Sequence, residues 1–218
     1  MCGRFGLEYG DDFYPRFKIK NLLPGLKSNF NISPGQDVPV IRQEQEGNTV
    51  GLMRWGFVPS WADDPKIGYK MFNARIETIQ EKPTFRSSFI SRRCLVPASF
   101  FYEWKEEDGK KIPHCINVLN EKYFSMAGIF SHWTDKKTNL VLNTFSILTS
   151  SPNDDLSKIH DRMPVILKPE AESIWLEKGS EPYEFLDITK DTLDIQFDIS
   201  RLENDFIFGQ ENSPSKSH

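Results

Sequence analysis

A cysteine stands directly behind the initiator methionine in the opening stretch MCGRFG. Removal of Met1 would leave Cys2 with a free α-amine and a thiol on adjacent carbons. Ordinary pKa values, about 7.7–8.0 for the amine and about 8.5 for the thiol, give both groups a nucleophilic fraction near neutral pH. An aldehyde condenses with such an amine to an imine, and the thiol then closes a five-membered thiazolidine ring. The alternative, which position alone favours, is a frayed or buried Cys2 without a role.

Two further side chains are candidates for moving the protons that imine chemistry needs. Glu103 lies among aromatic residues in SFFYEWK. Its carboxylate either faces solvent on an alternating strand, which the pattern favours, or lies in an apolar pocket that raises its pKa. His160 lies beside Asp161 in KIHDRMP. A His–Asp pair suits acid–base catalysis, but a histidine that caps a helix end is equally common.

Aromatic and basic residues in the first half of the chain indicate a surface for nucleic acid. Trp55 and Trp61 flank the segment RWGFVPSW, where they either pack on the core or form a platform for stacked bases. Asn73 and Arg75 are two residues apart and share a face if this segment is extended. Arg86 begins the most basic stretch, FRSSFISRR. Its guanidinium suits phosphate, although such a run is more often a solvated face.

The bulk composition limits the classes of protein to which this chain can belong. The net charge is −4, which argues against a general nucleic-acid coat protein but leaves room for a local basic groove. Three cysteines without short pairing predict no disulfide framework and favour the cytoplasm. Without a C-x-x-C pair and with scattered histidines, no metal site is expected. No signal-peptide pattern and no run of about 18 apolar residues are present, so we expect no membrane span.

The hydrophobic pattern predicts strands in the middle of the chain and helices at its flanks. A turn and an extended stretch are expected over 28–43, where Pro39 suggests an edge strand. Further strands are expected over 49–58, across 92–133 and over 141–150, and helices over 11–23, 151–164 and 168–180. Strands grouped in this way favour an α+β fold over an alternating βαβ fold.

Eight sequence blocks together resemble one family. They are MCGRF, NISPGQ, MRWGFVPSWA, FNARIET, FRSSF, RRCLVPASFFYEW, MAGIF and IHDRMPVIL, and they run in family order from residue 1 to about 167. The chain resembles the SOS-response-associated peptidase (SRAP) family, abasic-site processing proteins that crosslink to damaged single-stranded DNA. A weaker helical resemblance continues to about 208. One departure is Phe100, which stands where the family usually has glycine before the aromatic pair.

The resemblance implies a fold and two sets of site residues. The expected fold is a single α+β domain over residues 1–208, with a mostly antiparallel, barrel-like bifurcated β-sheet flanked by helices. A disordered polar tail is expected over 209–218. The implied catalytic residues are Cys2, Asn73, Glu103 and His160. The implied DNA-binding residues are Arg4, Trp55, Trp61, Arg75, Arg86 and Arg162.

The resemblance also implies a function. The protein would bind abasic sites in single-stranded DNA and form a thiazolidine crosslink through Cys2 after Met1 removal, which shields the lesion. An abasic-site lyase activity and an autopeptidase activity limited to Met1 are further expectations, with no cofactor, no membrane and a monomeric state. We expect a cytoplasmic protein that joins the nucleoid when it binds damaged DNA. Two alternatives remain: an N-terminal-nucleophile cysteine peptidase, and a non-covalent reader of single-stranded DNA.

Overall fold

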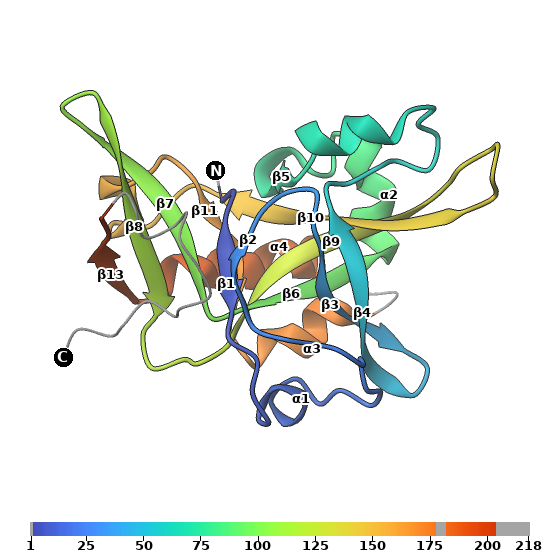
Figure 1. The fold of residues 1–218 in the computed structure, drawn as a ribbon, viewed down its shortest axis with the longest axis horizontal. Helices are drawn as coiled ribbons and strands as arrows, with labels where there is room; N and C mark the ends of the chain where they lie inside the picture. The colour runs from blue at the N-terminus through green and yellow to red at the C-terminus, as the bar shows by residue number, and fades with distance from the viewer. Residues whose placement is uncertain (1, 178–181, 204–218) are drawn as a thin grey trace.

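The computed structural model describes residues 2–177 and 182–203, and strands dominate this part of the chain (Figure 1). The N-terminal strand belongs to a five-stranded sheet in the order β13-β8-β7-β1-β2. Its strands are β1 (Phe5–Leu7), β2 (Asn29–Ile32), β7 (Phe100–Glu107), β8 (Lys110–Val118) and β13 (Phe197–Arg201). All neighbouring strands in this sheet are antiparallel.

The second sheet closes into a barrel of five strands. β10 pairs with β4, β4 with β3, β3 with β6, β6 with β9, and β9 with β10 again. These strands are β3 (Asp37–Glu44), β4 (Gly47–Trp55), β6 (Arg93–Ala98), β9 (Phe124–Thr134) and β10 (Val141–Ser150). Three short strands extend the sheet: β5 (Asn73–Arg75) and β11 (Met163–Pro164) on β10, and β12 (Ile166–Leu167) on β9. The expected α+β fold with a barrel-like, mostly antiparallel sheet is confirmed.

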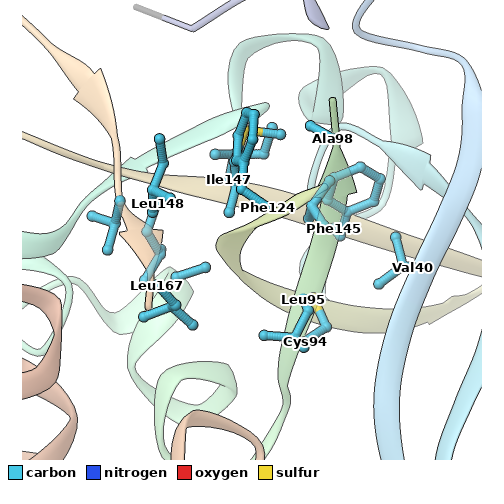
Figure 2. Close-up of a cluster of buried hydrophobic side chains, with 14 of the residues drawn as sticks. Val40, Cys94, Leu95, Ala98, Phe124, Phe145, Ile147, Leu148 and Leu167 are labelled. Atoms are coloured by element: carbon cyan, nitrogen blue, oxygen red, sulfur yellow. The ribbon is translucent and has the colours of Figure 1, made fainter. Parts of the chain in front are cut away.

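Apolar side chains fill the barrel. Figure 2 shows residues of β3, β6, β9, β10 and β12 gathered in one cluster, among them Val40, Leu95, Phe124, Phe145 and Leu167. The last seven residues of β10 are all buried, which is typical of a strand covered on both faces. This burial explains why the stretch VLNTFSILTS is nearly continuous in apolar and small residues.

Short helices cover the outside of the barrel and connect its strands. The α-helices are α1 (Phe13–Arg16), α2 (Pro83–Ser91), α3 (Ala171–Leu176) and α4 (Pro182–Lys190). The 3₁₀ helices are η1 (Pro65–Lys70), η2 (Ile76–Thr78), η3 (Leu156–Lys158) and η4 (Asp191–Asp194). Trp175 of α3 attaches this layer to β6, because its indole N–H donates to the Cys94 carbonyl at 3.0 Å. In the described part of the chain, none of these helices combines the length and apolar character needed to cross a bilayer.

Several predicted elements differ from those observed. The helix expected over 11–23 shrinks to α1, since Lys18 adopts a positive φ of 53° that ends helical geometry. The helix expected over 151–164 is wrong: only η3 is helical, and Met163 pairs with Ser150 of β10. The helix expected over 168–180 is α3, within shorter bounds.

The prediction of an edge strand at Pro39 is also wrong. Its strand, β3, lies between β4 and β6 in the barrel. In the pairing of β3 with β6, Ile41 lies opposite Leu95. This pair is two residues beyond Pro39, so the missing N–H of the proline does not interrupt the pairing with β6. The polar tail expected over 209–218, and the last residues of the expected domain, lie outside the described residues.

Candidate active site

Cys2 lies at the start of the N-terminal strand, where β1 runs between β2 and β7. The Tyr102 N–H donates to the Arg4 carbonyl at 2.9 Å, and this pairing leads the chain end along β7 toward Glu103. Cys2 is completely buried. Burial, reinforced by the nearby Glu103 carboxylate, raises the pKa of the Cys2 thiol far above its ordinary value. The thiol is therefore protonated at neutral pH. Complete burial excludes a frayed Cys2.

Phe100, the residue that departs from the family pattern, packs directly on the N-terminal strand. A Cβ atom added to Gly6 would lie 2.2 Å from the Phe100 ring. The ring is held from the other side, since it stacks on Phe30 and meets Tyr102 edge-on. Glycine at position 6 and phenylalanine at position 100 thus complement each other. Glu103 keeps its register opposite His114 of β8.

Asn73 approaches Cys2 from the barrel. β5 adds to β10 in parallel, with Asn73 opposite Ile147, and this register directs the Asn73 amide toward the N-terminal segment. Its Nδ2 donates to the Cys2 carbonyl at 2.8 Å. Its Oδ1 is buried and has no hydrogen-bond partner within the described residues. A buried acceptor of this kind favours a ligand or substrate donor as its partner.

Glu103 is buried at the wall of a polar cleft rather than on a solvated face. It is only 3 % exposed, and desolvation, with a contribution from the Asp161 carboxylate, raises its pKa to about 7. Of the two arrangements that the sequence left open, the buried one is observed. A carboxyl group with a pKa near neutrality can donate a proton and take it back at physiological pH.

His160 faces Glu103 across the site. Its Nε2 lies 3.9 Å from Glu103 Oε2, and burial lowers the pKa of the imidazole. Its Nδ1 accepts a hydrogen bond from the Arg162 main-chain N–H at 3.0 Å, which favours the neutral ring with its proton on Nε2, toward Glu103. Asp161 Oδ1 lies 2.8 Å from the same Nδ1 and competes with this donor, because the carboxylate favours a proton on Nδ1. Burial raises the pKa of Glu103 and lowers the pKa of His160, so Glu103 holds its proton at a pH at which the imidazole is neutral.

An open cleft of about 640 Å³ lies beside Glu103 and His160. Glu103, His160 and Asp161 line it together with two residues that the sequence analysis missed, Trp104 and Lys111. The available signal for Trp104 was its position beside Glu103. Lys111 carried no signal, because only the pairing of β7 with β8 brings it to the cleft.

Comparisons with known proteins decide the family. A family model described as SOS response associated peptidase (SRAP) matches residues 1–205. The chain is a member of the SRAP family. The match covers every residue of the predicted catalytic set.

Relatives of known name agree with this membership. The chain is 45% identical over 188 residues to abasic site processing protein YoqW of Bacillus subtilis, covering 84% of this chain and 83% of the relative. It is 39% identical to YoaM of the same organism, over 100% of this chain and 95% of the relative. The crystal structure of a protein from Bacteroides thetaiotaomicron superposes with a TM-score of 0.88 at 29% identity, covering 98% of this chain and 97% of that one.

The two tryptophans predicted to bind DNA in this SRAP protein differ in exposure. Trp55 is completely buried, stacks on Phe145 and donates from Nε1 to the Phe72 carbonyl at 2.8 Å. Its ring has no face for a base, so the prediction that Trp55 stacks on DNA is wrong, and the alternative of a core residue holds. Trp61 is 62 % exposed, and its role in DNA binding stays a prediction.

The predicted DNA-binding arginines also divide in this SRAP protein. Arg75 and Arg86 are exposed, and half-buried Arg4 donates to Asn31 Oδ1 at 2.5 Å. Arg162 is only 8 % exposed, and its guanidinium is bound by Glu77 and by the Thr149 carbonyl. A direct phosphate contact by the Nη groups of Arg162 would have to displace Glu77, because these donors already have partners in the protein.

Proposed function

We propose that this protein processes abasic sites in single-stranded DNA and forms a thiazolidine crosslink through Cys2 once Met1 has been removed. One observation carries the proposal: residues 2, 73, 103 and 160, remote in sequence, lie together beside the cleft that Glu103 and His160 line. The relatives named abasic site processing proteins support the same substrate class. An abasic deoxyribose opens to an aldehyde, which is the electrophile that an aminothiol captures.

Because the buried thiol has a raised pKa and is protonated, the amine rather than the thiol attacks first in this proposal. Glu103, protonated up to a pH of about 7, donates to the sugar ring oxygen and opens the aldehyde. The Cys2 amine adds to the aldehyde carbon, and the resulting hydroxyl leaves as water to give an imine. The thiol sulfur then bonds to the same carbon while its proton passes to the imine nitrogen through Glu103 or His160. The net loss is one water.

Asn73 and His160 support these steps in the proposal. The Asn73 Nδ2 holds the Cys2 carbonyl at 2.8 Å, and its buried Oδ1 would accept from the liberated Cys2 amine or a sugar hydroxyl. His160 would relay protons during imine formation and release. If the imine instead loses the 3′ phosphate by β-elimination, the same residues give a lyase. Release of Met1 by the chain itself, with Glu103 as helper, completes the proposed activities.

We further infer that DNA binding relies on exposed and half-buried groups at the surface. Arg4, Arg75 and Arg86 would neutralise phosphates, and Trp61 would stack on a base. The proposed chemistry uses only the α-amine and side chains of this chain and calls for no cofactor. A monomer suffices, since all four catalytic candidates come from one chain. We propose a cytoplasmic protein that joins the nucleoid on damaged DNA.

The test is adduct formation with a single-stranded oligonucleotide that carries one abasic site. The protein without Met1 should give a heat-stable adduct whose intact mass is the sum of the two reactants less one water. Cys115→Ala is the matched control, because Cys115 is also buried but belongs to a separate apolar cluster. It should form the adduct normally. A Cys2→Ala chain that gave the same heat-stable adduct would exclude the thiazolidine.

The same assay separates the alternatives. An oligonucleotide with a tetrahydrofuran in place of the abasic sugar has no aldehyde, so equal binding to it without any adduct would indicate a non-covalent reader. Turnover of peptides without DNA would indicate a cysteine peptidase, whereas loss of Met1 alone would not. Retention of Met1 in the purified chain would leave no free aminothiol and would abolish the reaction.

A further inference from the structure

An arginine–carboxylate pair joins the buried Arg162, two residues after His160, to the exposed Glu77. Arg162 Nη1 and Nη2 donate to the two carboxylate oxygens of Glu77 at 2.7 and 2.8 Å, and Nη2 also donates to the Thr149 carbonyl at 2.6 Å. Two parallel hydrogen bonds of this kind fix the orientation of both planar groups. Glu77 lies in η2, directly after the strand that carries Asn73.

Glu77 holds both ends of the loop that carries His160. The loop starts after β10 at Ser151, whose N–H donates to Glu77 Oε1 at 3.2 Å. It returns to the sheet at β11, immediately after Arg162, whose side chain donates to the same Oε1. One carboxylate therefore joins residues 151 and 162 across the base of the loop. Removing it would take a hydrogen bond from each end of the loop, leaving the pairing of β10 with β11 as the remaining closure.

The pair also reaches the imidazole itself. With its side chain held by Glu77, Arg162 directs its main-chain N–H to His160 Nδ1 at 3.0 Å. This donor favours a proton on Nε2, which lies 3.9 Å from Glu103 Oε2, against the Asp161 carboxylate, which favours a proton on Nδ1. Without that donor, Nδ1 is free to carry the proton and to donate to Asp161, 2.8 Å away. The Nε2 lone pair would then face Glu103.

We propose that Glu77 is a positioning residue for the reaction: through Arg162 it fixes the His160 loop and keeps the imidazole proton on Nε2, toward Glu103. The inference rests on the proposed function for its kinetic consequence, but the tautomer itself is independent of DNA. The charged or titratable groups around the imidazole include the amino terminus of the chain, Glu103 of β7, Lys111 of β8, and Asp161 and Arg162 of its own loop, with Glu106 in the same cleft.

Two measurements on Glu77→Gln test this role. Glutamine keeps the size of the side chain but has one acceptor oxygen in place of two, and no charge. The first measurement is the ¹⁵N shift of the His160 ring nitrogens without DNA, assigned with His160→Gln. The wild type should show Nε2–H, and Glu77→Gln a mixture of both tautomers. The second is the single-turnover rate of adduct formation against pH, which should fall about tenfold, as for one lost charge-assisted hydrogen bond.

Matched variants keep the result decisive. Glu81→Gln changes an exposed carboxylate in the neighbouring turn and should leave tautomer, rate and pH profile as in the wild type. Arg162→Lys retains the main-chain N–H but loses the bidentate pair, and it should shift the tautomer in the same direction if Glu77→Gln fails to fold. Wild-type tautomer and rate in both variants, with only the melting temperature lowered, would overturn the inference. If the tautomer shifts in Glu77→Gln but the wild-type protein itself forms no adduct, the proposed function alone is refuted.

Discussion

Replacing Glu103 by glutamine tests whether the fold keeps this carboxyl group protonated. Burial raises its pKa from 4.5 to about 7. At 1.36 kcal/mol for each pH unit, this difference corresponds to about 3 kcal/mol between the folded and unfolded chain. That is a large share of the stability of an ordinary domain, about 5–15 kcal/mol. The protein therefore keeps a carboxyl group with a near-neutral pKa at the expense of stability.

The sign of the effect follows from linkage. The folded chain binds this proton more tightly than the unfolded chain does, because the folded pKa is the higher one. The stabilising contribution is complete below a pH of about 4.5 and is lost as the pH rises through about 7. Glutamine does not titrate. We expect Glu103→Gln to have a similar unfolding free energy to the wild type at low pH and one higher by up to about 3 kcal/mol at pH 8.

Urea unfolding of both chains between about pH 4.5 and 8 measures this directly. For a chain of this length, about 3 kcal/mol corresponds to a melting temperature higher by about 6–12 °C. Glu106→Gln is the control, because the same substitution on the same strand removes an exposed carboxylate and should change stability by less than about 0.5 kcal/mol. If the stabilities of Glu103→Gln and the wild type run parallel across this pH range, the burial argument is refuted.

Three further predictions concern packing and DNA binding. Gly6→Ala should lower the unfolding free energy by about 1–3 kcal/mol, as overpacking does, and Phe100→Ala in the same chain should recover part of that loss; full stability of Gly6→Ala contradicts the 2.2 Å contact. Trp61→Ala should weaken single-stranded DNA binding by about 1–3 kcal/mol at unchanged melting temperature. Trp55→Ala should instead cost about 3–5 kcal/mol of folding stability. DNA titrations and thermal melts that gave the reverse result would refute the assignment of Trp61 to DNA binding and of Trp55 to the core. Arg75→Ala should reduce the slope of log affinity against log salt by about 0.7, and an unchanged slope would exclude a phosphate contact.

The catalytic candidates illustrate how far the sequence reaches. Cys2 was recognisable because its chemistry depends only on its place in the chain. For Glu103 the sequence offered two environments and favoured the solvated one, since alternation along a strand does not tell whether both faces are covered. The pairing of β7 with β1 and β8 buries it. The same limitation applies to Trp55, which looked exposed in a loop-like stretch but lies beneath Phe5 and against Phe145.

Helix prediction failed for a related reason. The segment 151–164 has the proline and acidic residues of a helix start, yet only Leu156–Lys158 is helical. The hydrogen bonds of Glu77 to Ser151 and Arg162 hold the segment as a loop instead. Local propensity is a weak preference that such tertiary contacts override. Arg162 was accordingly assigned to phosphate from its motif, although Glu77 holds its guanidinium in the structure.

The sequence by itself determined the aminothiol precursor at Cys2, the family, and the strand-rich α+β class, since these follow from residue order, motif order and hydrophobic period. Only the tertiary structure decided which side chains meet. The pairing of β1 with β7 and of β5 with β10 brings residues 2, 73 and 103 together, and the 151–162 loop adds His160. Burial, the tautomer of His160 and the partner of Arg162 are properties of that assembly. They depend on contacts between distant segments, which no local pattern encodes.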